Sequence, residues 1–430
     1  MGTYKDSGIE WIGEIPREWN LDISKNIFRE HKLRNYKNLE NNLLSLSYGK
    51  VVQKDIESLA GLIPESFSTY NIIQKDDIVL RLTDLQNDKR SLRTALCKED
   101  RGIITSAYLT LRLVTNNNAS YLHYLLHSYD VCKVFYNLGG GVRLGGSWSD
   151  VGKLPLLLPS LQEQAAIADF LDKKNAEIDA VIAKITQQIQ TLKDYRKSLI
   201  TETVTKGLDK TVSYKDSGIE WIGEIPEGWE ISKVKYKYEF TTGFTPDTSN
   251  TEFYDDENGA IWVTIADMDE NKYIFDSKSK LSSIYIETYT PKPVKKGSLL
   301  YSFKLSVGKT AFAGTDLYTN EAIGAFINHE NVNLNYLNYA SFLMEFNANR
   351  NIYNAKLLNS TLIKNSIIVV PPLQEQAAIS DFLDDKTTKI DCIIAKKEQQ
   401  LDIIKEHRKS LIYEYVTGKK RVKEYQQDGN

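Results

Sequence analysis

The feature that most constrains the fold of this chain is a set of short segments that occurs twice. Thirteen residues, YKDSGIEWIGEIP, occupy 4–16 and again 214–226, an offset of 214 − 4 = 210. The motif LQEQAAI occupies 161–167 and again 373–379, an offset of 373 − 161 = 212. An internal repeat of this length indicates two copies of one structural plan. Each copy consists of a short head, a long middle and a tail.

The two middles, Glu18–Leu158 and Gly228–Val370, show no comparable likeness. Both contain short apolar runs divided by turns, which is typical of α/β domains. Strands are expected at 77–82, 108–113, 154–158, 260–265, 297–303 and 324–328, and helices at 121–136 and 336–347. A constant frame around two different middles suggests a scaffold that presents two domains with different recognition specificities.

Both tails have the heptad pattern of long helices. The first lies between Ser160, which opens a capping box with Glu163, and Gly207, and about 45 helical residues span roughly 65–70 Å. Lys397 stands where the first tail has Ile185, and a lysine on such a seam tends to fix register. The residues expected to pack along the helix pair or against a partner are Leu171, Ile178, Ile185, Leu192, Leu199, Leu383, Ile390, Ile394, Leu401, Ile404 and Leu411.

The predicted fold is α/β (α+β), with two globular domains separated by a pair of long antiparallel helices and a pseudo-two-fold internal repeat. The alternative is that each helix packs separately on its own domain. The expected segments are a first domain with its head, a first helix, a second domain with the repeated head, a second helix and a flexible tail, at 1–158, 159–208, 209–370, 371–420 and 421–430.

Composition excludes several classes of protein and of site. No apolar run approaches the roughly 18 residues of a membrane span, and the N-terminus lacks the regions of a secretory signal, so we expect a cytoplasmic protein. The three cysteines are far apart and fit buried or incidental thiols. His123 and His127, one helical turn apart with no acid nearby, are expected to be surface or partly buried residues. We expect no catalytic site, no metal site and no cofactor in this chain.

The repeated heads are interpreted as structural. Trp11 and Trp221 are expected to be packing anchors beneath the domains. The acids of the head, Asp6, Glu10 and Glu14, have no histidine at a useful spacing and fit capping or solvated roles.

Several loops carry side chains suited to nucleic acid. The loop 81–93 is rich in Arg, Lys, Gln and Asn, which read guanine and adenine edges or bind phosphates; an ordinary charged surface loop is the alternative. The glycines at 139–146 fit a hinge better than a phosphate loop. By count, residues 21–157 hold 18 basic and 14 acidic residues (+4), and 231–369 hold 14 and 15 (−1). The candidate DNA contacts are Arg81, Gln86, Asn87, Lys89, Arg90, Arg93, Arg143, Ser147, Thr242, Thr245, Lys304, Ser306, Lys309, Asn354 and Lys356.

The whole chain resembles the specificity subunit of type I restriction–modification systems. The likeness rests on the paired DSGIEWIGEIP heads, the paired LQEQ openings, the helices ending in RKSLI and the two dissimilar middles. The second middle is similar to that family's target-recognition domain in GFTP (243–246), IWV (261–263) and the stretch 307–323. One departure is that the loop 352–364 lacks the glycines of its first-copy counterpart.

The resemblance implies that each middle reads one half of a split, asymmetric double-stranded DNA sequence and that the helices set the spacer between the halves. It implies two modification (methyltransferase) subunits docked on the helices, with restriction subunits added. S-adenosylmethionine, ATP and Mg²⁺ would bind in those partners. The runner-up is a coiled-coil scaffold whose middles bind proteins without reading DNA; a DNA-mimicking inhibitor would need a more acidic surface, and a nuclease would need a metal site.

Overall fold

The structure is a computed structural model that describes residues 3–47, 49–55, 66–83, 85, 92–138, 145–269, 271–304, 306–350 and 356–422. Its contacts divide the chain into two compact units. Unit 1 contains 1–187 and 398–430, and unit 2 contains 188–397. The boundary therefore crosses both long helices, and each unit holds the beginning of one helix and the end of the other. The predicted linear segments treat the helices as separate pieces instead.

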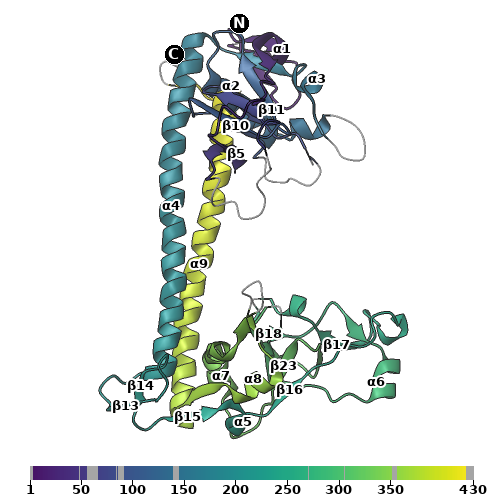
Figure 1. The fold of residues 1–430 in the computed structure, drawn as a ribbon, viewed down its shortest axis with the longest axis vertical. Coiled ribbons are helices and arrows are strands. Elements are labelled where there is room, and N and C mark those ends of the chain that lie inside the picture. Colours follow the sequence, from purple (N-terminus) through teal and green to yellow (C-terminus); the bar gives the residue numbers. More distant parts are fainter. Residues whose placement is uncertain are drawn as a thin grey trace. The chain divides into compact units, whose positions relative to one another are not determined.

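The two long helices are α4 (Leu161–Lys206) and α9 (Leu373–Val416), drawn in Figure 1. At α4 the Ser160 hydroxyl accepts a hydrogen bond from the Glu163 amide at 3.2 Å, which is one half of the predicted capping box. The Glu163 carboxylate accepts from Trp19 and Arg421 instead. Each helix is followed closely by a glycine with positive φ, Gly207 or Gly418, both at +74°. A left-handed residue at this place ends a helix at little steric cost for glycine.

Within each unit the two helices pair antiparallel. In unit 1, Arg408 of α9 donates to Asp179 of α4. In unit 2, Arg196 of α4 pairs with Asp391 of α9 at 2.9 Å. These pairs are equivalent, since 408 − 196 = 212 and 391 − 179 = 212, so the arginine of RKSLI serves both copies alike.

The predicted seam residues are buried where the domains also pack on the helices. Leu171 and Leu383 are fully buried, Ile390 and Ile394 nearly so, and the other predicted positions are half-buried. Lys397, which interrupts the apolar seam, donates to the Gln188 side chain at 2.7 Å in unit 2. A specific polar contact of this kind can hold one register.

Unit 1 is built on the sheet β4-β11-β8-β9, in which each neighbouring pair is antiparallel. Helix α2 (Ala119–Val131) packs into the same core as the start of α4 and the end of α9. The other helices are α1 (Ser24–Ile27), α3 (Trp148–Val151) and the 3₁₀ helix η1 (Val134–Asn137). The strands are β1 (Tyr4–Asp6), β2 (Glu14–Pro16), β3 (Asn20–Ile23), β4 (Phe28–Glu30), β5 (Leu44–Ser47), β6 (Lys50–Gln53), β7 (Asn71–Gln74), β8 (Ile78–Leu80), β9 (Thr94–Leu96), β10 (Arg101–Ile104), β11 (Leu109–Leu113) and β12 (Pro155–Leu158).

Unit 2 repeats this plan with the sheet β16-β23-β20-β21-β18. Its helices are α5 (Val234–Lys237), α6 (Ser283–Tyr289), α7 (Leu334–Ala340) and α8 (Ser360–Asn365), with the 3₁₀ helices η2 (Thr251–Phe253), η3 (Ile265–Asp267) and η4 (Ser341–Asn347). Its strands are β13 (Tyr214–Asp216), β14 (Glu224–Pro226), β15 (Glu230–Lys233), β16 (Phe240–Thr242), β17 (Ala260–Val263), β18 (Tyr273–Ile274), β19 (Lys280–Leu281), β20 (Leu299–Ser302), β21 (Thr310–Ala313), β22 (Tyr318–Thr319), β23 (Ile323–Phe326), β24 (Asn349–Arg350), β25 (Lys356–Leu357) and β26 (Ile367–Val370).

The mixed α/β fold with two long, packed helices is confirmed, and each expected strand is present within a few residues. The helix expected at 121–136 ends at Val131, and the one expected at 336–347 is α-helical to Ala340 and then a 3₁₀ helix to Asn347. The two middles, unlike in sequence, share one arrangement of the central sheet. In both units the strand before the long helix pairs antiparallel with the strand after the head, β12 with β3 and β26 with β15. No helix of the described residues is long and apolar enough to cross a membrane.

The expectation for the head tryptophans is right for one copy and wrong for the other. Trp11 is half-buried and packs edge-on against Tyr129 at 6.0 Å between ring centroids. Trp221 is 40% exposed and stacks on Phe346 at 4.1 Å. The identical heads meet different middles, so the same side chain finds a core in one unit and only one ring in the other. The capping role of the acids holds for Asp6, which accepts from the Gly8 amide at 2.9 Å.

Candidate nucleic-acid interface

The base of each recognition domain is fixed to its helix by a buried tryptophan and the glutamate of LQEQ. Trp19 donates from Nε1 to Glu163 at 3.1 Å, and Trp229 donates to Glu375 at 2.7 Å. Both rings are buried. A buried indole N–H needs such an acceptor, so the repeated motif has a structural role in each copy.

Two tyrosines in each unit tie the domain to the helix pair. Tyr121 donates to the carbonyls of Leu157 and Val416, and Tyr336 donates likewise to Val369 and Val204. One turn further on, Tyr124 donates to Asp172 at 2.7 Å and Tyr339 donates to Asp384 at 2.6 Å. Burial, together with the hydrogen bond to the carboxylate, raises the pKa of Tyr124 and of Tyr339 above the usual value. These hydroxyls therefore keep their protons and act as donors.

Two loops meet at the end of the central strand in both units. In unit 1, the Gly146 amide donates to the Leu82 carbonyl at 3.0 Å. In unit 2, the Leu358 amide donates to the Phe303 carbonyl at 3.2 Å. In unit 1 the contact joins the segment after β8 to the segment before α3, and in unit 2 it joins the segment after β20 to the segment before α8. We call this place the loop junction. The described ends of the predicted segments therefore meet, 81–83 with 146–147 in unit 1 and 303–304 with 356–358 in unit 2.

The loop junction of unit 1 borders a hollow of about 530 Å³. Cations, hydroxyls, one indole and the carboxylate of Glu30 line it, and Glu30 pairs with Lys32 at 2.8 Å. The hydroxyls and Arg34 suit contacts to phosphates and base edges. Of these residues, sequence analysis singled out only Ser147, because the others lie in three separate segments that gave no shared motif. The lining includes Lys32, Arg34, Ser106, Tyr108, Ser147, Trp148 and Ser149.

Ser147 begins α3 through a capping box. Its hydroxyl and its amide both donate to Asp150, at 2.6 and 2.9 Å. These hydrogen bonds from Ser147 lower the pKa of the Asp150 carboxyl. Ser147 is exposed, yet its hydroxyl is committed to the cap and to Ser149.

Arg93 is a structural residue and is removed from the proposed interface. Its side chain is completely buried, and its guanidinium donates to the carbonyls of Arg81 and Thr83 at 2.9 and 2.8 Å. It also lies over the Tyr136 ring. Arg93 therefore joins the end of the loop 81–93 to its beginning, where the half-buried Arg81 lies. The predicted contacts Gln86, Asn87, Lys89, Arg90, Arg143 and Asn354 lie outside the described residues.

In unit 2, Thr242 and Thr245 are exposed on a loop that aromatic side chains hold in place. Trp262 donates to the Phe244 carbonyl at 3.0 Å, and Tyr254 donates to the Pro246 carbonyl at 3.2 Å. The loop is thus fixed at two carbonyl groups, those of Phe244 and Pro246, on either side of Thr245.

The lysines expected in unit 2 differ in what they contact. Lys304 is exposed and Ser306 is half-buried beside it. Lys309 is exposed along its length, but its ammonium donates to the Met268 carbonyl at 2.9 Å. Lys356 pairs with Glu345 at 2.7 Å. Lys304 is therefore the cation of this group that makes no ion pair or hydrogen bond from its ammonium among the described residues.

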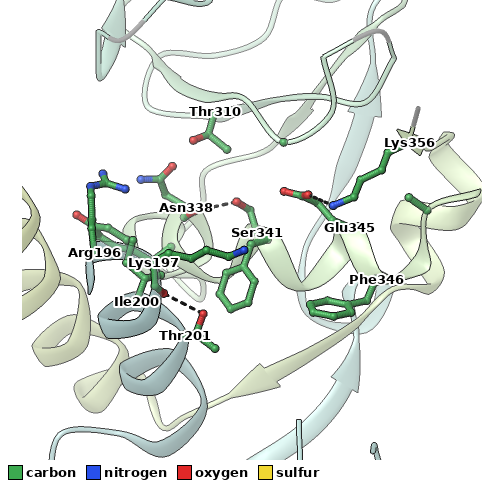
Figure 2. Close-up of a pocket in the computed structure, with 14 residues that line it drawn as sticks. Arg196, Lys197, Ile200, Thr201, Thr310, Asn338, Ser341, Glu345, Phe346 and Lys356 are labelled. Carbon is green, nitrogen blue, oxygen red and sulfur yellow. Dashed lines mark hydrogen bonds and ion pairs between the residues drawn. The ribbon is translucent and has the colours of Figure 1, made fainter. Parts of the chain in front are cut away.

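A second hollow, of about 690 Å³, lies in unit 2 between α4 and the domain (Figure 2). Arg196 and Lys197 of α4 form one wall, and the pair Lys356–Glu345 lies on the other. Phe342 and Phe346 supply apolar surface. Sequence analysis missed this hollow because residues more than 100 positions apart form it.

Comparison with known proteins agrees with this architecture. Residues 226–402 match the family model of the type I restriction modification DNA specificity domain. The putative type I restriction enzyme MjaX specificity subunit of Methanocaldococcus jannaschii is 26% identical, over 96% of each chain. The chain belongs to the type I restriction–modification specificity subunits. The type I restriction enzyme HindI specificity subunit of Haemophilus influenzae is 26% identical over 39% of this chain and 38% of its own.

Solved structures share the fold of this specificity subunit. One, from work on complex assembly and conformational transition of the type I R-M system, has a TM-score of 0.71 at 16% identity and covers 94% of this chain and 98% of its own. The HsdS subunit from Thermoanaerobacter tengcongensis has a TM-score of 0.50 at 17% identity, with the same coverage.

As a specificity subunit the chain supplies DNA target recognition and is non-catalytic. Among the described residues no group of three or more His, Cys, Asp and Glu could hold a metal ion. His123 and His127 are partly buried on α2, and burial lowers their pKa values to about 3 and about 4. Their partial burial is one of the two outcomes expected for this pair.

Proposed function

We propose that each unit reads one half of a bipartite, asymmetric DNA target through its loop junction. The observation that carries the proposal is that the same backbone contact recurs in both units with different side chains around it. Unit 1 offers Arg34 there, with Lys32 paired to Glu30, and unit 2 offers Lys304. The exposed Thr242 and Thr245 lie at the end of β16 and on the loop that follows it. Unlike side chains on a common frame would select unlike half-sites, so the target would not be palindromic.

A domain exchange tests this proposal. Residues 21–157 are replaced by the corresponding middle of another specificity subunit, and the methylome of a host carrying the chimera with its modification subunit is sequenced. The expected result is that one half-site changes while the other half-site and the spacer stay. An unchanged target would refute the proposal. Loss of DNA binding by a scaffold that still assembles would favour the alternative, a coiled-coil protein that binds partners without DNA readout.

We further propose that the helices set the spacer. Inserting one heptad after Gln187 and another after Lys397 adds about 10.5 Å to each helix, which matches about three base pairs at 3.4 Å each. Both insertion points lie at the boundary between the units. The expected target has both half-sites unchanged and a spacer longer by about three base pairs. Altered half-sites with an unchanged spacer would count against this role.

The proposed partners are two modification subunits, with restriction subunits joining the assembly. Support comes from apolar residues exposed at equivalent places of the two helices. Leu161 and Leu373 are 52% and 50% exposed, and Val181 and Ile393 are 45% and 44% exposed. Both pairs are offset by 212 residues, so two copies of one partner would find the same surface twice. S-adenosylmethionine, ATP and Mg²⁺ would bind in those partners, and the cytoplasmic location stays a prediction.

The docking proposal has a direct test. Val181→Asp and Ile393→Asp are introduced singly and together into the full chain, and the mass of the complex with modification subunits is measured by native mass spectrometry. Each single variant is expected to lose one modification subunit and the double variant both. Retention of two modification subunits by the double variant would exclude this surface.

A further inference from the structure

We infer that the hollow of unit 2 between α4 and the second recognition domain is a subsite for a phosphate of the DNA backbone. This inference rests on the proposed DNA-reading function. It adds a contact made by the spacer helix itself, outside the loop junction. The subsite is formed by Lys197 and Arg196 on one side and by Thr310 and Asn338 on the other (Figure 2).

The helix wall provides cationic donors that the protein leaves available. Lys197 is exposed, and its ammonium has no hydrogen-bond or ion-pair partner among the described residues. Figure 2 shows its side chain extending from α4 into the hollow. Arg196 meets Asp391 through Nε, at 2.9 and 3.2 Å, and its two terminal nitrogens have no partner in the described part of the chain. Both side chains can therefore donate to an anion.

The facing wall adds neutral donors and little negative charge. The Thr310 hydroxyl and the Asn338 amide form no hydrogen bond with any described residue and line the same space. Glu345 is the acid of the lining, and Lys356 neutralises it at 2.7 Å. The lining carries +3 from Arg196, Lys197 and Lys356 and −1 from Glu345, and Asp391, which pairs with Arg196 from outside the lining, brings the balance to +1. A phosphate would therefore enter a positive environment.

Position selects DNA as the source of that phosphate. Gly308 and Thr310, which line the hollow, belong to or directly follow the segment 304–309 of the proposed reading surface. A backbone that passes this segment would bring successive phosphates towards the hollow. Contacts to phosphates fix register and orientation without carrying sequence information. The apolar rings of Phe342 and Phe346 suit the sugar beside such a phosphate.

The equivalent place in unit 1 has its cations already occupied. Arg408 and Lys409 stand 212 residues after Arg196 and Lys197. Arg408 donates through a terminal nitrogen to Asp179, and Lys409 pairs with Glu406 at 2.6 Å. The lysine of RKSLI thus has no ion-pair partner among the described residues in unit 2 (Lys197), whereas in unit 1 it pairs with an acid (Lys409 with Glu406). The inferred phosphate contact belongs to the second recognition domain alone.

The test measures the salt dependence of DNA binding by the assembled complex of the full chain with modification subunits. Lys197→Met is compared with the matched control Lys409→Met and with Lys197→Arg, which keeps the charge. Affinity for a duplex with the target and for one without it is measured by fluorescence anisotropy between 50 and 200 mM NaCl. Removing one phosphate contact lowers the slope of log K against log salt by about 0.9. The ratio of wild-type to Lys197→Met affinity then shrinks about 3.5-fold over this fourfold range of salt.

The expected result is that Lys197→Met weakens binding to both duplexes with the lower slope, while Lys409→Met and Lys197→Arg keep the wild-type slope. An unchanged slope for Lys197→Met would overturn the inference, as would weakening confined to the target duplex, which indicates base reading. Loss of modification subunits from the Lys197→Met complex would assign the hollow to a partner's acidic side chain and also overturn it. The proposed DNA-reading function is tested separately: if the wild-type complex methylates a bipartite target, that function holds even where one of these results overturns the phosphate subsite.

Discussion

Replacing Arg421 by methionine should destabilise unit 1 by about 3–4 kcal/mol at pH 7. Arg421 donates to Glu163 from Nε at 3.0 Å and from a terminal nitrogen at 2.7 Å, and its other terminal nitrogen reaches Glu18. The Glu163 side chain is 3% exposed and that of Arg421 is 15% exposed. Breaking a buried pair costs about 3–5 kcal/mol because one charge stays buried without its partner. The Trp19 N–H would be the remaining donor to that carboxylate.

Thermal unfolding of the full chain measures this penalty. Unit 1 has 187 + 33 = 220 residues, for which 1 kcal/mol shifts the midpoint by about 2–4 °C. The Arg421→Met midpoint should therefore fall by about 6–16 °C at pH 7. Lys210 is the matched control, because it follows Gly207 by three residues as Arg421 follows Gly418. Its exposed pair with Glu202 should contribute less than about 1 kcal/mol. Equal shifts for both variants would refute the reasoning.

Two further outcomes are expected. Acidification should destabilise unit 1, because the pKa values of His123 and His127 lie at about 3 and about 4 while an unfolded histidine titrates near 6.5. Stability should fall as the pH drops from 6.5 towards 4, by less than about 2.7 kcal/mol per pH unit since both rings keep some exposure. The H123N/H127F variant should show a shallower dependence in melts between pH 7 and 5. Gly243→Ala should cost about 1–3 kcal/mol, because its Cβ would come within 2.0 Å of the Thr319 carbonyl, whereas Gly228→Ala meets nothing within 4 Å and should melt like wild type.

The frame could be predicted from the sequence because its signals are local or repeated. Heptads predicted α4 and α9, and alternation predicted the central strands. The roles of Trp19 and Trp229 were missed in favour of Trp11 and Trp221, since identity between copies directed attention to the longest repeat. The tryptophans that reach LQEQ lie just outside it, and only the packed structure shows the contact.

The candidate contacts were harder to predict because charge alone does not distinguish a surface arginine from a structural one. Arg93 and Arg81 lie twelve residues apart in one basic loop, yet Arg93 is buried because backbone carbonyls there need a donor. Conversely, Lys32 and Lys197 carry no local signal in the sequence. Their place at a hollow follows from strands and helices that meet only in three dimensions.

The loop junction explains how one frame can accept unlike middles. Its defining hydrogen bond joins the Gly146 amide to the Leu82 carbonyl in one unit and the Leu358 amide to the Phe303 carbonyl in the other. Because both partners are backbone groups, the contact places no demand on the side chains that carry it. Within the frame, tryptophan, glutamate and tyrosine side chains form the hydrogen bonds that hold each domain to its helix. Side chains around the junction can therefore change with the DNA sequence they read without removing a hydrogen bond that holds the domain to its helix.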